Sequence, residues 1–500
     1  MTSHANQARP SIRLPATLAI GFTGHRTLSD EPKSKKLLYE FLSQRKAAAP
    51  GLIYGVASAA AGADLLFGES CVELEIPLQV LLPMPQEEFR KDFDADTWAR
   101  VENLLSHAVS VEVTGGNQPR DERYYECGIE TVQKSGLLLA LWDGEPSHGM
   151  GGTADIVSFA KEVGMPVVWF HSVTGELQIF NEKPEYELLH DAELDFLNDL
   201  PDVKSEFDAN TEQGLAWSWF RKVDHCANIS APQLRRLAAI PIVCTAAAAL
   251  VTGAASGVHN ITTWLSIGSA LGILSAALPF ALGLSGRQSL WARTRTAAEV
   301  CRSVLALWDT PASYQAIGPE VIPEFAGMLG SLNYLKMRDR AQAGVALEDF
   351  KQRYRHERVS GQIAYFSKHA AQSAAEARRY HAAIKVSVGL AVVMAAWLFV
   401  GSYAFKGLNP GHWKHLLALG ASIAFQVATV AGALIVVNDC ERRRQRYREM
   451  HYLLTEWDAQ LDRLRTWTSV LRVANRIERS LLIEVIEWRS VMRNRKMPSK

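Results

Sequence analysis

The feature that most constrains this chain is a set of four long stretches without a charged side chain. Residues 237–256, 264–284, 386–405 and 415–438 contain no Asp, Glu, Lys or Arg. As a helix rising about 1.5 Å per residue, each would span roughly 30 Å, the thickness of the hydrocarbon core of a bilayer. Few residues separate the members of each pair, so each pair is expected to form a tight hairpin. The sequence therefore predicts four membrane-spanning helices, with buried helices of a soluble core as the alternative.

Basic residues around these stretches predict the orientation of the chain. Arg235 and Arg236 precede the first stretch, and five arginines lie within 442–448, just after the fourth. The turn 257–263 contains no Lys or Arg, and the turn 406–414 contains two lysines. By the positive-inside rule, the N-terminus, the segment between the hairpins and the C-terminus are all predicted to be cytoplasmic.

The sequences around the two hairpins resemble each other, as expected for an internal repeat. At an offset of 149 residues Trp264 aligns with Trp413, and matching basic and aromatic residues follow in the same order. This pattern indicates a tandem duplication of a helix, a hairpin and a long cytoplasmic helix. The predicted units are 216–340 and 341–480, followed by a cytoplasmic tail over 481–500.

Small residues inside the spans bear on assembly. Gly268 and Gly272 form a GxxxG pair, which lets helix backbones approach closely. The contact lies either within one hairpin or between protomers, and the sequence leaves both open. The second case would make the protein a homo-oligomer.

Composition excludes several classes of protein. Lys and Arg number 53 and Asp and Glu number 53, so no net charge draws the chain to nucleic acid, and no nucleic-acid partner is expected. Six cysteines are scattered without a CxxC pair or a nearby His at ligand spacing, which argues against a zinc site and against a disulfide framework. The first twenty residues lack the apolar core of a signal peptide, so the N-terminal domain is expected to stay in the cytoplasm.

The first third of the chain alternates short apolar runs with helix-compatible stretches. Runs that are apolar throughout and alternate with helices are typical of a parallel sheet covered on both faces. We therefore predict a doubly wound α/β domain over 15–172, after a flexible segment 1–14 and before a linker over 173–215 with one short helix. The predicted strands are 17–22, 52–57, 78–82, 109–113, 137–142 and 166–170.

Three loops of this domain follow predicted strands, where open α/β sheets bind ligands. The first carries two glycines with a His and an Arg, the second is a turn of small residues that opens a helix, and the third is rich in glycine and also runs into a helix. A helix amino end favours an anion because its N–H groups are free and its dipole is positive there. The candidate ligand-binding residues are Gly21, Thr23, Gly24, His25 and Arg26; Ser58, Gly62, Ala63 and Asp64; and Trp142, Asp143, Gly144, Gly151, Gly152 and Thr153.

Some roles stay open at this point. His25 is either a general acid or a hydrogen-bond donor to the ligand, and the second role fits its position beside an Arg in a glycine loop. Trp142 either stacks on a base or closes the edge of the sheet. Tyr124 and Tyr125 are interpreted as packing residues. Arg120 and Arg123 are interpreted as exposed charges at the start of a helix.

The order of the three loops supports a resemblance. GFTGHR, then GVASAAAGAD, then LLLALWDG with GMGGTADIV resembles the SLOG superfamily, the nucleotide-sensing relatives of the LOG cytokinin-releasing enzymes. The resemblance covers 15–172. It implies a Rossmann-like pocket for a nucleotide-derived ligand and no other cofactor.

The same resemblance bears on catalysis. LOG-type phosphoribohydrolases carry a PGGxGTxxE loop whose Glu is needed for N-glycosidic cleavage, whereas GGTADI places Ile156 at that position and Asp155 one residue earlier. An isoleucine cannot supply the carboxylate that oxocarbenium chemistry needs. A binding-only pocket without a catalytic residue is therefore expected, and a membrane-anchored nucleotide N-glycosidase that uses Asp155 is the alternative.

The hairpin units resemble SLATT domains, the two-helix membrane effectors that accompany SLOG domains in prokaryotic conflict systems. This resemblance covers about 216–470. Together the two resemblances imply a multi-pass effector of antiphage defence in the bacterial inner membrane. It would sense a nucleotide, cyclic-nucleotide or ADP-ribose-like signal and permeabilise the lipid bilayer.

Overall fold

The computed structural model describes residues 12–49, 51–114, 116, 118–147, 149–182, 191–254, 261–281, 283–310, 322–340, 345–404 and 413–494. The chain divides into two compact units. One comprises Met1–Val223 with Val300–Ala346, and the other comprises Asp224–Glu299 with Leu347–Lys500.

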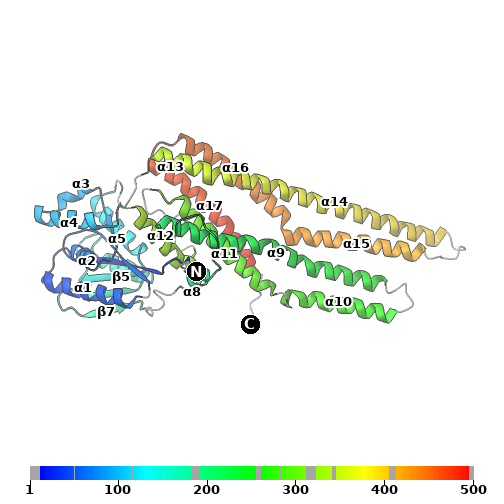
Figure 1. Cartoon of the computed structure of the whole chain (residues 1–500), viewed down its shortest axis with the longest axis horizontal. Helices are drawn as coiled ribbons and strands as arrows, with labels where there is room; N and C mark the ends of the chain where they lie inside the picture. The colour runs from blue at the N-terminus through cyan, green and yellow to red at the C-terminus, as the bar shows by residue number, and fades with distance from the viewer. Residues whose placement is uncertain are drawn as a thin grey trace, which may run out of the picture. The chain divides into compact units, whose positions relative to one another are not determined.

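A seven-stranded sheet forms the centre of the first unit, in the order β4-β3-β2-β1-β5-β6-β7 (Figure 1). The first six strands are parallel, and β7 pairs antiparallel with β6. The six predicted strands are all present, each within two residues of its predicted bounds. The strands are β1 (Thr17–Gly24), β2 (Leu52–Ala57), β3 (Leu78–Leu82), β4 (Ser110–Val113), β5 (Leu137–Trp142), β6 (Val167–His171) and β7 (Leu177–Phe180).

Helices cover both faces of this sheet. One core cluster joins apolar residues of α1, α2 and α4 to alternate positions of the central strands, and a second joins α5 and α6 to the opposite face. This is the predicted doubly wound architecture. The helices are α1 (Glu31–Ala48), α2 (Ala63–Glu73), α3 (Gln86–Phe89), η1 (Arg90–Asp92), α4 (Ala95–His107), α5 (Arg120–Gln133) and α6 (Thr153–Glu162).

The segment predicted as a linker, 173–215, contributes to the fold. It contains β7 at the sheet edge and the short helix α8 (Ala192–Asn198), whose Leu194 and Leu197 are buried. The strand escaped prediction because its side chains are largely exposed, so backbone pairing with β6 rather than an apolar run holds it in place.

A later part of the chain returns to the first unit. After η3 (Pro323–Phe325), helix α12 (Ala326–Arg340) packs at the amino ends of the central strands. Ser331 Oγ donates to the Pro15 carbonyl at 2.5 Å, and the ring centroids of Tyr334 and Tyr54 lie 5.5 Å apart. Residues 300–310 and 322–340, predicted to belong to the first hairpin unit, therefore complete the sheet domain.

Buried polar contacts fix the start of α9 (Glu212–Ala254) within the first unit. Asn198 Oδ1 accepts from the Leu14 N–H and from Trp219 Nε1, each at 2.9 Å, and Asn198 Nδ2 donates to the Leu14 carbonyl. Lys222 Nζ donates to the carbonyls of Ile12 and Asn198 at 2.8 and 2.7 Å. Residues 12–14, predicted as flexible, are thus hydrogen-bonded, whereas residues 1–11 lie outside the described part.

The second unit is helical, and its element order repeats. A long helix, an apolar helix and a third helix occur as α9, α10 (Ile261–Ala281) and α11 (Leu284–Ala306), and again as α14 (Ser360–Ala404), α15 (Trp413–Asn438) and α16 (Cys440–Arg463). Helix α13 (Leu347–Arg353) and the π-helix η4 (Tyr354–Val359) lead into α14. Helix α17 (Trp467–Asn494) extends through most of the predicted tail and buries Leu481, Leu482 and Val485.

Small and hydroxylated residues hold the two helices of the first apolar hairpin, α9 and α10, against each other. Thr245 Oγ1 lies 2.6 Å from Ser275 Oγ, which also donates to the Pro241 carbonyl at 2.8 Å. Gly268 faces Thr252 so closely that a methyl group there would collide with the hydroxyl. Gly268 therefore serves contact within the hairpin, while no described atom lies within 4 Å of where a Cβ of Gly272 would be.

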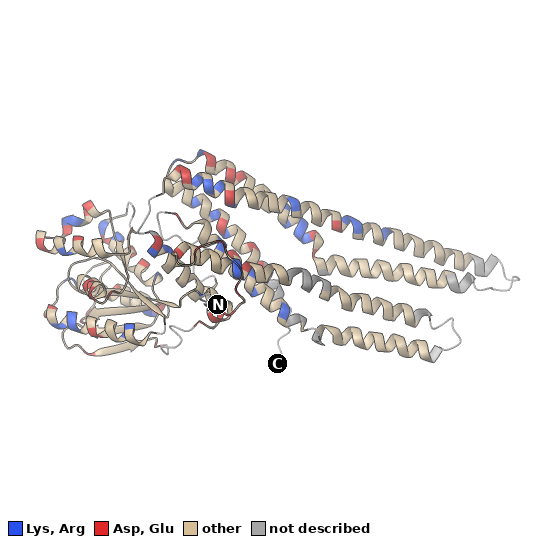
Figure 2. Cartoon of the chain, viewed as in Figure 1, with Lys and Arg blue, Asp and Glu red and all other residues tan. Residues whose placement is uncertain are grey.

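Two described stretches, Leu347–Val400 and Leu417–Arg463, contain segments long and apolar enough to cross a membrane. The apolar parts of the first hairpin that are described, Ala239–Thr252 and Thr263–Pro279, are shorter. Figure 2 shows no charged residue in the described part of α10 or along most of α15. The prediction of four spanning helices is thus supported for the second hairpin by length and composition.

A buried ion cluster lies in the second unit. Arg358 of η4 donates to Glu299 of α11 at 3.0 Å and to Glu478 of α17 at 2.6 Å, and its side chain is 6% exposed. Tyr354 donates its hydroxyl to Glu478 at 2.9 Å. Each buried charge is therefore paired, which a low-dielectric interior requires.

Asn198→Ala is expected to lower the free energy of unfolding of the first unit by about 2–4 kcal/mol, because it leaves the Leu14 N–H and the Trp219 indole N–H buried without partners. Thermal unfolding of the detergent-purified chain measures the change. Asn210→Ala, at an exposed turn, is the control, and an equal shift in both variants would contradict the role given to Asn198.

Candidate functional site

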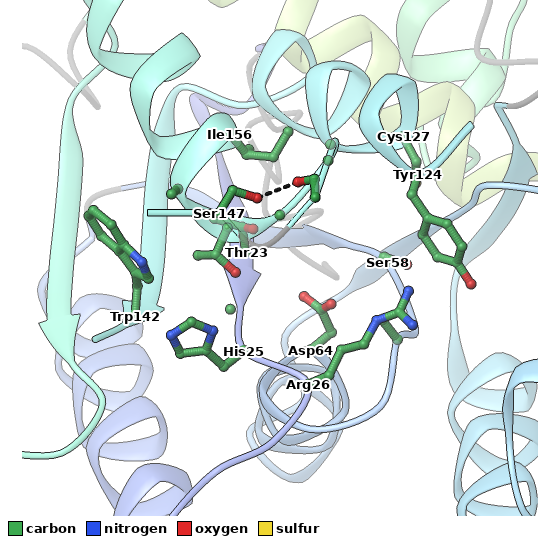
Figure 3. A pocket seen from close by; sticks show the side chains of 18 of the residues that line it. Thr23, His25, Arg26, Ser58, Asp64, Tyr124, Cys127, Trp142, Ser147 and Ile156 are labelled. Atoms are coloured by element: carbon green, nitrogen blue, oxygen red, sulfur yellow. Dashed lines mark hydrogen bonds between the residues drawn. The ribbon is translucent and has the colours of Figure 1, made fainter. Parts of the chain in front are cut away.

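A cavity of about 600 Å³ lies at the carboxyl ends of the central strands (Figure 3). The strand order reverses between β1 and β5, and this switch point leaves a crevice above the sheet. Eleven of the fifteen predicted site residues line the cavity: Thr23, Gly24, His25, Arg26, Ser58, Asp64, Trp142, Asp143, Gly151, Gly152 and Thr153. The three loops therefore converge on one space.

The other four predicted residues lie outside the lining. Gly21 lies within β1, where a side chain would collide with Ser135, which follows the end of α5. Gly144 has φ +86 and turns the chain beside the Trp169 ring. Gly62 and Ala63 hold the first two loops together.

The contact at Gly62 is close. Its φ is +84, and a side chain there would collide with the carbonyl oxygens of His25 and Arg26. The Ala63 N–H donates to the His25 carbonyl at 2.9 Å, which locks the loop after β1 onto the start of α2. Glycine is required at this position both for its backbone conformation and for the close approach.

The third loop presents the amino end of α6 to the cavity. Gly152 is the N-cap, and Thr153 and Ala154 of the first turn line the cavity. Gly151 has φ +85, and its N–H donates to Asp155 Oδ2 at 3.0 Å. The first-turn amides and the helix dipole make this end of the cavity suited to an anion.

His25 and Asp143 face each other across the loops after β1 and β5. His25 Nε2 lies 3.0 Å from Asp143 Oδ1 and 3.1 Å from the Asp143 backbone nitrogen. A protonated Nε2 donates to the carboxylate, whereas an unprotonated Nε2 accepts from the amide. Partial burial opposes ionisation of Asp143, but hydrogen bonds from the Glu145 amide and from His25 hold its pKa below the ordinary value.

Arg26 lies over the ring of Tyr124, with its Cζ 4.6 Å from the ring centroid. Among the described residues it forms no hydrogen bond or ion pair, so its donors remain for a ligand. Tyr124 donates its hydroxyl to Asp92. Burial, the largest cause, and this hydrogen bond raise the pKa of Tyr124 to about 12.

The structure corrects the interpretation of α5. Tyr124 lines the cavity rather than only packing, and Asp92 lines it without having been predicted. Arg120 pairs with Asp92 at 2.5 Å, and Arg123, whose side chain is 14% exposed, pairs with Glu88 at 2.9 Å. These arginines are therefore members of an ion-pair network rather than exposed charges. A lone Asp in a short helical turn gives no sequence signal for such a role.

Asp64 is a buried carboxyl group at the floor of the cavity. It is 7% exposed, and its Oδ1 has no hydrogen-bond partner among the described residues. Burial raises its pKa well above the ordinary value, against the opposing effect of Arg26. The Ser58 hydroxyl, also on the lining, is likewise buried, and the Cys127 thiol beside it is a weak hydrogen-bonding group.

At the LOG-type catalytic position, Ile156 lines the cavity with an apolar side chain, whereas Asp155 lies outside the lining. Ile156 is buried and packs on Gly128 of α5 so closely that a larger residue at 128 would collide with it. The Asp155 carboxylate accepts from the Gly151 amide and is not among the lining residues. Neither side chain is placed to protonate a leaving group in the cavity.

Trp142 ends β5, which lies inside the sheet rather than at its edge, and stacking of its ring on a base stays a prediction. Its Nε1 donates to the Glu145 carbonyl at 2.8 Å, its ring centroid lies 5.2 Å from that of Trp169, and it lines the cavity. Packing thus fixes a ring that also borders the ligand space. Within the described residues no group of three or more His, Cys, Asp or Glu side chains could hold a metal.

Gly62→Ala is expected to lower the free energy of unfolding by about 3 kcal/mol or more, because a positive φ and a collision with two carbonyls act together. Gly164→Ala is the matched control, since Gly164 has φ +73 but open space around it and should lose only about 1 kcal/mol. Chemical denaturation compares the two. Equal losses would show that close approach adds nothing at Gly62.

Asp64→Asn is expected to stabilise the chain at pH 8 by about 1–3 kcal/mol, because it removes an unpartnered buried carboxyl group. A raised pKa in the folded state means that the wild type loses stability as the pH rises above about 4. The gain should therefore shrink between pH 8 and pH 4.5. Melting temperatures across this range test it, with exposed Asp121→Asn as the control; a gain independent of pH would contradict the assignment.

No known family model matches this chain, and no curated protein matches it.

Proposed function

We propose that the cavity binds a nucleotide-derived ligand and that the chain is a membrane effector controlled by this binding. The observation that carries the proposal is the convergence of three loops, each at the carboxyl end of a strand, on one cavity at the switch point of the sheet. Cavities of this size and position are the usual ligand sites of open α/β sheets.

The amino end of α6 supports a phosphate position. Gly151 and Gly152 bring the backbone to the cavity, and the first-turn amides of α6 lie beside them. At both glycines the place of a side chain is taken by the protein itself, by the Tyr125 backbone at Gly151 and by Ser147 Oγ at Gly152, so the first-turn amides are the groups that would hold an anion. His25 also lines the cavity and can add a hydrogen bond to the ligand (Figure 3).

Arg26 and Tyr124 support a position for the rest of a nucleotide. The guanidinium and the phenol ring present flat surfaces beside each other, and Arg26 keeps its donors free of described partners. Arginine stacks on planar groups and pairs with oxyanions, so it suits either a base or a second phosphate. A linear, cyclic or ADP-ribose-like nucleotide fits this chemistry.

The exposed apolar surface of the hairpins supports a membrane location. Trp397, Phe399 and Phe425 are 63%, 68% and 62% exposed, and the apolar window of the helix that carries Trp397 is not buried at all. A soluble protein rarely exposes so many large apolar side chains in one region, and a helix satisfies its own backbone in lipid. We place both hairpins in the bacterial inner membrane with both termini in the cytoplasm, following the arginine-rich flanks.

The link to permeabilisation rests on the resemblance to SLOG and SLATT proteins and on chain continuity. Helix α9 runs without a break from the buried contacts of Trp219 and Lys222 into the first apolar hairpin. Ligand binding can shift a closed-to-open balance only by its differential affinity, and a change from 1:99 to 99:1 needs about 5.5 kcal/mol. A homo-oligomer in which several sites act on one pore would supply that energy. This is the antiphage effector that we propose.

The alternative of an N-glycosidase that uses Asp155 finds no support in the contacts of this residue. It needs an acid at the anomeric carbon, whereas Ile156 is apolar and the Asp155 carboxylate is bound to the Gly151 amide. We therefore propose binding without hydrolysis.

Purified chain in dye-filled liposomes should release dye when a panel of nucleoside monophosphates, cyclic nucleotides and ADP-ribose is added. Arg26→Ala should lower the apparent affinity for the active nucleotide by about tenfold to a hundredfold, because a charged hydrogen-bond donor is lost. Dye fluorescence and equilibrium binding measure the two effects. Arg45→Ala is the matched control, since Arg45 also lies over an aromatic ring, Phe41, but outside the cavity.

The outcomes separate the parts of the proposal. Binding without dye release would contradict the effector role, and failure of the whole panel to bind would contradict the nucleotide site. Release of free base from bound nucleotide would favour the N-glycosidase instead.

A further inference from the structure

Two buried polar groups of the cavity are poorly satisfied. Among the described residues, Asp64 Oδ1 has no hydrogen-bond partner, and the Ser58 hydroxyl has only the weak Cys127 thiol beside it. Both belong to the loop that joins β2 to α2, and both line the cavity. Figure 3 shows the Asp64 carboxyl group directed toward the open space bordered by His25 and Arg26.

A structural role does not account for Asp64. It lies in the first turn of α2, where Asp often caps a helix, but Gly62 is the N-cap and no side-chain hydrogen bond caps this end. Burial of an unpartnered carboxyl group is unfavourable by itself, and most buried polar groups in folded proteins are hydrogen-bonded. A ligand that supplies the missing partners resolves the conflict.

The chemistry of the two groups narrows the ligand. A phosphate supplies only acceptors and repels a carboxylate, so it does not suit Asp64. A hydroxyl both donates and accepts, and therefore pairs with a carboxyl group in either protonation state and with a serine hydroxyl. Two neighbouring hydroxyls satisfy Asp64 and Ser58 together.

We infer that Asp64 and Ser58 bind the ribose hydroxyls of the ligand and select ribonucleotides over nucleotides that lack these hydroxyls. The inference rests on the proposed nucleotide site, whose phosphate position is the amino end of α6.

The sheet order gives both ends of such a ligand a place. Asp64 and Ser58 follow β2, Gly151 and Gly152 follow β5, and β1 lies between these strands. Two strand spacings, about 10 Å, separate the two loops. One extended ligand therefore reaches the helix amino end and the buried carboxyl group at once, and the negative charges of phosphate and Asp64 stay apart.

The test compares the four ribonucleoside 5′-monophosphates with their 2′,3′-dideoxy counterparts on the full chain in detergent. Wild type should bind the preferred ribonucleotide about tenfold or more tightly than its dideoxy form, because two buried polar groups are left unpaired by the latter. In Asp64→Ala the ratio should fall to about twofold, mainly through weaker binding of the ribonucleotide. Isothermal titration measures each dissociation constant.

Two further variants keep the test decisive. Ser58→Ala removes one oxygen atom and should also lower the ratio, which covers the case in which Asp64→Ala fails to fold. Asp121→Asn removes an exposed carboxylate from the same cavity and should leave the ratio unchanged.

Each outcome bears on a different claim. Equal binding of ribo- and dideoxynucleotides by wild type, or an unchanged ratio in both Asp64→Ala and Ser58→Ala, overturns the inference and leaves the nucleotide site standing. No binding of any nucleotide by wild type overturns the proposed function and this inference with it.

Discussion

The cavity of the first unit depends on one close approach of two backbones. Gly62 lies against the carbonyl oxygens of His25 and Arg26, and the Ala63 amide donates to the first of these. Without this contact the loop after β1 would not be held against α2, and the positions of His25 and Arg26 relative to Asp64 would not be fixed. The geometry of the site is therefore set by backbone atoms, and its chemistry is supplied by side chains that the backbone holds in position.

Stability and binding make opposite demands on the same residues. Asp64 Oδ1 is buried without a described hydrogen-bond partner, and Ser58 has only the Cys127 thiol beside it, which lowers the stability of the free protein. Arg26 rests on Tyr124 while its donors remain unused by described residues. In contrast, Asn198, Trp219 and Lys222 at the other end of the unit satisfy one another and the backbone. Polar groups without hydrogen-bond partners lie where a ligand is expected, whereas hydrogen-bonded polar groups lie where the fold is stabilised.

Much of the fold could be predicted because buried parallel strands and uncharged spans leave strong local patterns. All six parallel strands and the apolar part of the second hairpin follow from apolar runs such as 137–142. What could not be predicted depends on contacts between distant residues. Strand β7 is held by pairing with β6, and α12 packs on strands more than 250 residues earlier in the chain. The glycine loops predicted most of the cavity lining. Asp92 and Arg120 line the cavity only because helices pack together there, and this packing leaves no local sequence pattern.

The return of α12 to the sheet changes how the chain is divided. The first apolar hairpin interrupts the sequence of the sheet domain, because residues on both sides of it, up to Val223 and from Val300, belong to the same compact unit. It is therefore an insertion within that domain rather than a module attached to its end. A fragment cut before Val300 would lose the cover over Pro15 and Tyr54. The chain therefore passes between the sheet domain and the first hairpin twice, at residues 223–224 and at residues 299–300.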